Sequence, residues 1–138
     1  MCSSDLAPPS EPEIPPIELL RPGSGGSRTT TYDVSTGVTT SVFDWDIGGA
    51  WRFENGITWE DSSITTMSIR DGDPLSARVD VRNTCLYDDG ELTVDVVAHS
   101  EMTCTADDFV VTCRLDVREN GTPLFDRTWD YRFPRSFM

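Results

Sequence analysis

The chain has 138 residues, enough for one domain of ordinary size, and its 24 acidic residues against 11 basic ones give a net charge of −13. So acidic a chain offers no cationic track for nucleic acid or for an anionic membrane surface, and no apolar run approaches the roughly 20 residues of a membrane-spanning helix. We therefore expect neither nucleic acid nor a membrane as a partner. All the basic residues are Arg, and this avoidance of A-rich Lys codons indicates a GC-rich, bacterial genome.

The first residues look foreign to the rest of the sequence. Residues 2–6 read Cys-Ser-Ser-Asp-Leu, which is the translation of a common sequencing-adapter end. We interpret residues 1–6 as such an artefact and expect the native gene to extend upstream. A lipoprotein cysteine at Cys2 is the alternative, but no charged or apolar export segment precedes it.

Residues 7–28 are predicted to form an extended linker. Six of the nine prolines lie between Ala7 and Gly26, and this stretch ends in Gly-Ser-Gly-Gly. Proline removes backbone donors, so the segment can be neither a helix nor a central strand, and its glycine-rich end should act as a flexible hinge. A linker in this position implies a preceding domain, so we expect the chain to be the C-terminal piece of a larger protein.

Residues 29–138 are predicted to be an all-β domain. Helical periodicity is nowhere sustained, whereas period-two alternation and closely spaced turns are. We expect an antiparallel meander of about eight strands, forming a curved sheet or partial barrel whose apolar face could rest on an upstream domain. Asp73-Pro74 should end one strand and begin the next. The expected strand segments are Thr29–Val34, Val38–Phe43, Ala50–Phe53, Ile57–Trp59, 62–70, 75–87, 91–104, 109–118 and 124–133.

Turn signals and alternation together predict the strand register. Asp89-Gly90 is a two-residue hairpin signal between 75–87 and 91–104, and it would set Tyr87 opposite Leu92 with all apolar residues on one face. In the last hairpin, one extra loop residue with Gly121 at positive φ keeps both strands in phase. The other predicted pairs are Val81 with Ala98, Leu75 with Cys104, Cys104 with Phe109, Cys113 with Trp129 and Leu115 with Arg127.

The residues indicate no catalytic, cofactor-binding or metal-binding site. His99 is the single histidine, it falls on the polar face, and no Gly-x-Ser-x-Gly elbow accompanies it. No cysteine–histidine spacing fits zinc, and the acidic turns at Asp71–Asp73 and Asp107-Asp108 do not fit a calcium loop. Paired carboxylates for glycoside hydrolysis stay open in so acidic a chain, but nothing singles out a pair.

Cysteines and aromatic residues are expected to pack in the core. Cys85, Cys104 and Cys113 fall on the apolar face but are separated by register, which is typical of small buried hydrophobes in a reducing compartment and favours a cytoplasmic location. An aromatic cluster on the same face suits core packing, with a ligand pocket as the alternative. Its members are Phe109, Phe125, Trp129, Tyr131 and Phe133.

Residues 69–78, Ile-Arg-Asp-Gly-Asp-Pro-Leu-Ser-Ala-Arg, resemble the C-terminal tail of the X-Pro dipeptidyl-peptidase / cocaine-esterase-like serine hydrolases. The sequence departs from the family pattern at Cys85, Cys104 and 44–46, which puts local packing in question. Further segments resemble the same tail in the same order. These are 19–22, Tyr32–Gly37, Met102–Phe109, 127–130 and Phe133–Arg135.

The resemblance implies a serine hydrolase parent that acts on peptides or esters. The family's Ser, Asp and His lie in an upstream α/β-hydrolase domain, so no catalytic residue is carried over to this chain. It implies a non-catalytic accessory domain whose partners are the parent's α/β-hydrolase and jelly-roll domains; the parent's substrate and homo-oligomeric state stay open. The alternatives are an independent β-sheet module that encloses a small apolar ligand and, for want of a base, the weaker idea of a free-standing enzyme.

Overall fold

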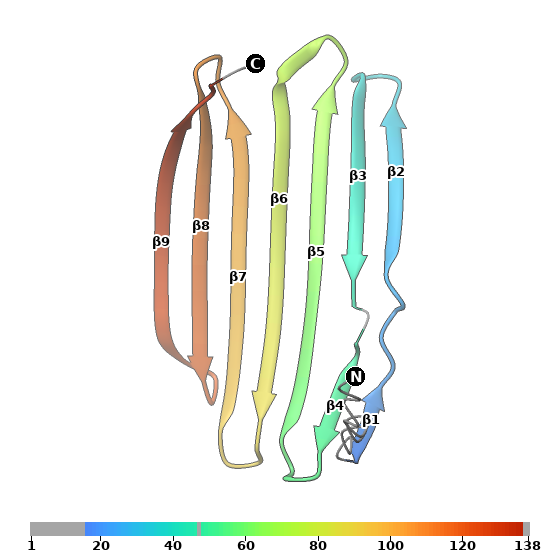
Figure 1. Ribbon diagram of the computed structural model, residues 1–138, viewed down its shortest axis with the longest axis vertical. Helices are drawn as coiled ribbons and strands as arrows, with labels where there is room; N and C mark the ends of the chain where they lie inside the picture. Colours follow the sequence, from blue (N-terminus) through green and yellow to red (C-terminus); the bar gives the residue numbers. More distant parts are fainter. Residues whose placement is uncertain (1–15, 47, 137–138) are drawn as a thin grey trace, which may run out of the picture.

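A computed structural model describes residues 16–46 and 48–136. Within these ranges the chain forms nine β-strands and no helix, and the strands join in one antiparallel sheet that stays open (Figure 1). The predicted all-β antiparallel architecture is confirmed. The strands are β1 (Ile17–Arg21), β2 (Ser27–Asp33), β3 (Val38–Trp45), β4 (Ala50–Phe53), β5 (Thr58–Arg70), β6 (Asp73–Asp88), β7 (Thr93–Cys104), β8 (Asp108–Glu119) and β9 (Thr122–Pro134).

Long strands that follow one another along the chain make up most of the sheet. Strand β5 joins them to β3 and β4, and through these to β2 and β1. From β5 to β9 each strand pairs with the next along the chain, as a meander requires. One edge of β5 is shared, because Ser63–Arg70 pairs with β3 while Thr58–Glu60 pairs with β4. The β2–β3 hairpin and the β1–β4 pair therefore lie end to end along the same side of β5 (Figure 1).

Strand β1 lies inside the segment that we expected to be linker. Ile17–Arg21 pairs with β4 at the edge of the sheet, because no proline interrupts these residues and each of them keeps its backbone donor. Arg21 fixes the end of the strand through ion pairs to Asp46 at 2.5 Å and to Glu60. The linker is thus shorter than expected, although the exclusion of a helix or central strand holds. Our interpretations of residues 1–15 fall outside the described residues.

The sequence also suggested a break in β5 that does not exist. Ile57–Trp59 and 62–70 were expected as separate strands, but Thr58–Arg70 is continuous. Glu60 and Asp61 stay in the ladder because they pair across β6 with Leu86 and Cys85. At the far end, β5 stops at Arg70 and β6 begins at Asp73, so the strand boundary predicted at Asp73-Pro74 is confirmed.

The β6–β7 register differs from the prediction by two residues. Tyr87 lies opposite Val94, and a four-residue turn replaces the two-residue one. The carboxylate of Asp89 accepts hydrogen bonds from the N–H groups of Glu91 and Leu92 at 3.0 and 2.8 Å, and this side-chain bonding favours the wider turn. A shift of two residues keeps every side chain on its predicted face.

The last two hairpins follow the predicted pairing. Cys104 lies opposite Phe109, Cys113 opposite Trp129 and Leu115 opposite Arg127. The extra residue needed for phase is Leu124, a bulge within β9, and not a loop residue. The turn itself has two residues at positive φ, Asn120 at 49° and Gly121 at 76°.

Register and alternation divide the side chains between two faces, which we name the apolar face and the polar face. Neither is covered, because among the described residues only Gly49 and Ala50 are buried. The cysteines and aromatic residues that we expected in a closed core are therefore at most half-buried. The apolar face includes Phe43, Trp59, Met67, Val81, Tyr87, Val96, Met102, Val111, Leu115, Phe125, Trp129 and Tyr131.

Arg127 is the one arginine that the register places among these aromatic side chains of β9. Its guanidinium lies 5.1 Å from the centre of the Trp129 ring. A cation over an aromatic face is attracted by the ring quadrupole, so no bulge or ion pair is needed to accommodate Arg127 on the apolar face.

Candidate functional site

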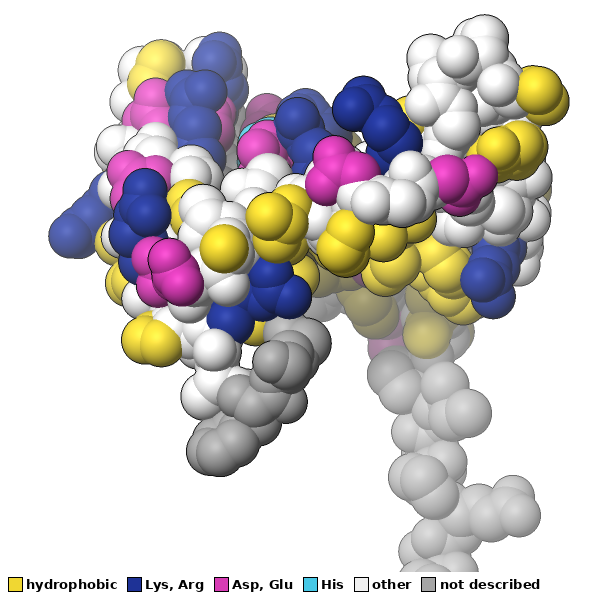
Figure 2. All heavy atoms as spheres, turned by 90° about the horizontal axis from the view of Figure 1, so that it is seen from above, with side chains coloured by type: hydrophobic (Ala, Val, Ile, Leu, Met, Phe, Trp, Pro, Cys, Tyr) yellow, Lys and Arg dark blue, Asp and Glu magenta, His cyan; other side chains and the backbone are white. Residues whose placement is uncertain are grey.

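The polar face carries a row of three basic side chains across its middle strands. Arg82 of β6 lies directly opposite His99 of β7, which lies directly opposite Arg114 of β8. Seen along the strands, this face is hollowed, and arginine and acidic side chains gather over it (Figure 2). The hollow has a volume of about 400 Å³ and is lined also by Val97, Asp116 and Arg118.

His99 is bonded to a carboxylate and not to a nucleophile. Its Nε2 lies 2.8 Å from Asp80 Oδ2, and its side chain is 42% exposed. A base oriented by a carboxylate is two-thirds of a catalytic triad. Among the described residues, however, no serine, threonine or cysteine hydrogen-bonds the His99 ring. The prediction that His99 lies on the polar face agrees with this position.

The arginines on either side of Asp116 are held by carboxylates. Arg114 donates from Nε and Nη2 to Asp126 at 2.9 and 2.7 Å, a two-pronged contact that lowers the pKa of Asp126. Arg118 Nε donates to Asp116 at 3.1 Å, and Arg114 Nη2 lies 3.7 Å from the same carboxylate. These contacts fix the direction of both guanidinium groups in the lining of the hollow.

The apolar face has a smaller hollow where its side chains are short. It has a volume of about 260 Å³ and includes Asp61, Ser63, Asn83 and Cys85. Burial, and then the nearby charge of Asp61, raise the pKa of the Cys85 thiol. A thiol with a raised pKa supplies less thiolate at neutral pH, so this arrangement does not activate Cys85 as a nucleophile.

Each acidic turn is hydrogen-bonded to a neighbouring segment of the fold. Asp71 accepts a hydrogen bond from the Tyr32 hydroxyl at 2.8 Å, and Asp107 O accepts one from the Arg135 N–H at 2.8 Å. Within residues 16–46 and 48–136, no three or more His, Cys, Asp or Glu side chains gather as a metal site would require. The same residues include no helix with the length and hydropathy to cross a membrane.

Sequence reasoning placed His99 correctly but missed the hollow around it. The predicted β6–β7 register puts Asp80, not Arg82, opposite His99, and the two-residue shift brings Arg82 into the row. Arg82, Arg114 and Arg118 alternate with residues of the apolar face. This alternation assigned all three arginines to the polar face and could have indicated that they lie near one another. Asp116 could have been assigned to that face by the same alternation.

Comparison with other proteins adds no relative on which to base a function. No family model, no curated protein and no solved structure matches this chain.

Proposed function

We propose that this chain is a non-catalytic C-terminal accessory domain of a bacterial serine hydrolase acting on peptides or esters, and that its apolar face packs on the upstream catalytic or jelly-roll domain. The observation that carries the proposal is the exposure of that face. Met67, Phe125 and Tyr131 are 43%, 41% and 48% exposed, although all three lie on the side that a sheet normally buries.

A flat partner suits this surface better than a small ligand. Large exposed apolar side chains extend across the face from β1 and β4 to β9, including Leu19 at 48%, Trp59 at 39% and Phe133 at 52%. Exposed apolar side chains over this breadth are typical of an interaction surface, although Asp61, Ser63 and Asn83 interrupt them in the middle of the face. The hollow beside Cys85 is shallow and open, whereas a module for an apolar ligand should enclose it.

The polar face suits solvent. Its charged side chains pair with one another, as Arg78 does with Glu101 and Arg132 with Asp108. Burying these pairs against a partner would cost desolvation energy that their mutual attraction does not reliably offset. The partner domain is therefore assigned to the apolar face.

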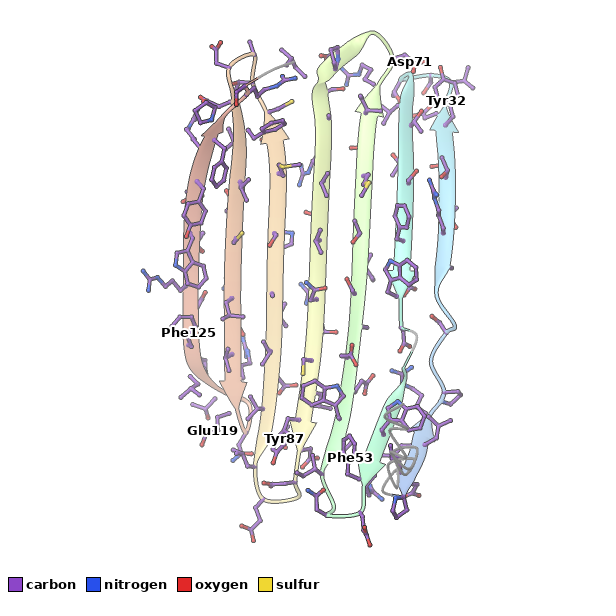
Figure 3. All side chains as sticks on the ribbon, viewed as in Figure 1. Tyr32, Phe53, Asp71, Tyr87, Glu119 and Phe125 are labelled. Atoms are coloured by element: carbon purple, nitrogen blue, oxygen red, sulfur yellow. The ribbon has the colours of Figure 1, made fainter. Side chains whose placement is uncertain are left out.

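One of the segments that resemble the hydrolase family, 19–22, lies at one end of the sheet, whereas four others, 32–37, 69–78, 102–109 and 133–135, lie at the opposite end (Figure 1). Tyr32 and Asp71 meet there, joining the β2–β3 turn to the β5–β6 turn (Figure 3). The β7–β8 turn and the C-terminal segment lie at the same end, where Arg135 Nη1 donates to Thr105 O at 2.8 Å.

Two adjacent residues of β5 provide the test. Met67 lies on the apolar face and its neighbour Ser68 on the polar face. The chain would be co-expressed with the upstream part of its reading frame as a separate tagged piece. We expect Met67→Glu to abolish co-purification and Ser68→Glu, which adds the same charge, to leave it intact.

Two results would contradict the proposal. One is an upstream reading frame that encodes no serine hydrolase, which would lack the Gly-x-Ser-x-Gly elbow. The other is equal co-purification for Met67→Glu and Ser68→Glu, which would place the interface elsewhere.

A further inference from the structure

The hollow on the polar face concentrates arginine in an acidic protein. Three of the chain's 11 arginines, Arg82, Arg114 and Arg118, line this one space of about 400 Å³. His99 separates Arg82 from Arg114, so no two of these arginines are direct cross-strand partners, but all three lie on one face around the same space. Such a cluster needs a compensating negative charge, and the chain supplies part of it.

Asp116 is that partial compensation. It is the one carboxylate of the lining, and it lies 3.1 Å from Arg118 and 3.7 Å from Arg114. Outside the hollow, Asp126 pairs with Arg114. Asp95 also lies directly opposite Arg118 on the polar face, and Asp80 holds His99. Arg82 makes no ion pair within the described residues, so its guanidinium is the one in this lining that no carboxylate holds.

Several donors remain free to reach a bound group. Arg114 uses Nε and Nη2 for Asp126, and Arg118 uses Nε for Asp116, so Nη1 of Arg114 and both terminal nitrogens of Arg118 have no acceptor in the described part of the chain. All the donors of Arg82 are likewise available within residues 16–46 and 48–136.

We propose that this hollow binds a small oxyanion, a phosphate or carboxylate group, with Arg82 as its main ligand and the free donors of Arg114 and Arg118 beside it. Guanidinium groups bind both oxyanions through paired N–H donors. The site lies on the face opposite the proposed domain interface, so it does not rest on the proposed function. Asp116 orients the guanidinium groups of Arg114 and Arg118.

The test titrates the 138-residue chain with inorganic phosphate and, separately, with acetate. Both titrations are followed by NMR at constant ionic strength, so that general screening does not change. We expect saturable shifts confined to β6, β7 and β8. The oxyanion that binds more tightly identifies the group the hollow accepts. If the isolated chain aggregates, the same titration is done on the longer protein.

Arg132 provides the matched control, because it is also on the polar face and pairs with Asp108 at 3.6 Å outside the hollow. We expect Arg82→Gln to weaken binding about tenfold or more, since a charge-assisted contact is lost, and Arg132→Gln to leave it unchanged. No saturable shift with either anion would overturn the proposal. Equal weakening by the two variants would also overturn it, as binding would then reflect net charge alone.

Discussion

Tyr32 and Asp71, which are 39 positions apart, are joined by a 2.8 Å hydrogen bond from the phenol hydroxyl to the carboxylate. The contact ties the β2–β3 hairpin to the turn between β5 and β6, and the Asp71 N–H reinforces it by donating to Gly37 O at 2.9 Å. The hydrogen bond to Asp71, and then the charge of that carboxylate, raise the pKa of Tyr32.

Removal of this carboxylate should therefore lower the pKa of Tyr32. We expect Asp71→Ala to return it toward the ordinary value of 10.0. The measurement is a phenolate absorbance titration of a chain in which Tyr87 and Tyr131 are replaced by Phe. Asp73→Ala is the control, since it removes the same charge two positions away. A Tyr32 pKa that moves equally in both variants would show that net charge, and not the hydrogen bond, sets it.

Asp33 should make the stability of the β2–β3 turn depend on acid. Hydrogen bonds from the Ser35 and Thr36 hydroxyls, at 2.7 and 2.8 Å, lower the pKa of Asp33 from 3.8 to about 2. A lowered folded-state pKa means that this stabilisation is fully present above the unfolded-state value and is lost as the pH falls through the folded-state value. The sensitive window is therefore about pH 4 to pH 2.

Substitution of Asp33 checks this window. We expect Asp33→Asn to lower the denaturant midpoint at neutral pH, and the difference from the unmodified chain to shrink between pH 4 and pH 2. Asp95→Asn removes the same charge from β7 and serves as the control. A deficit for Asp33→Asn that persists unchanged at pH 2 would assign the effect to something other than the carboxylate charge.

Gly49 should be required for the attachment of β1. A Cβ at this position would lie 2.0 Å from Arg21 O, and the residue has φ of 73°. Gly56 also has positive φ, 87°, but open space around it, so Gly56→Ala isolates the backbone strain of about 1–2 kcal/mol. We expect Gly49→Ala to cost more and to speed amide exchange in Ile17–Leu19. Equal effects of the two substitutions would mean that the close approach of Arg21 and Gly49 does not hold β1.

Local patterning was sufficient for much of this fold. Alternation assigned the strands from β6 to β9 to their correct faces, and it placed Trp129 opposite Cys113. Two-residue periodicity cannot detect a register shift of two, so the position of Arg82 beside His99 was not predictable. Whether Asp89 bonds the next backbone N–H groups or Gly90 closes a tighter turn is decided by small differences in free energy.

Tertiary pairing explains the other differences. The segment Ile17–Arg21 is too short for alternation to identify it as a strand. It forms one because β4 pairs with β5 on one side and leaves its other edge for this segment. Alternation likewise identified which face is apolar, but it carries no information on what covers that face. Within the described part of the chain, Phe125 and Tyr131, which were expected in the core, remain 41% and 48% exposed.

The isolated chain should have no esterase activity. His99 contacts Asp80 but no hydroxyl or thiol within the described residues, so the nucleophile–base contact of acyl transfer is missing. We expect no turnover of small aryl esters by the purified chain and no difference between it and His99→Ala. Turnover that disappears in His99→Ala would contradict this prediction.

The stability lost on truncating Trp129 should depend on whether the apolar face is covered. The Trp129 side chain is half-buried, with the Phe125 ring at 6.3 Å, whereas Thr128 is exposed on the other face. A fully buried aromatic residue costs about 3–5 kcal/mol on truncation to Ala. A half-buried one loses less, because part of its surface is already in water.

We therefore expect Trp129→Ala to cost less than about 3 kcal/mol in the isolated chain. If a partner domain covers the ring, as we propose, the cost should approach the full value in the longer protein. Thr128→Ala should stay within about 0.5 kcal/mol in both. Denaturant unfolding of the four variants measures the difference. An equal cost for Trp129→Ala in the two proteins would mean that the β9 part of the apolar face remains uncovered. A larger loss for Thr128→Ala would mean that β9 is inverted and the bulge at Leu124 does not exist.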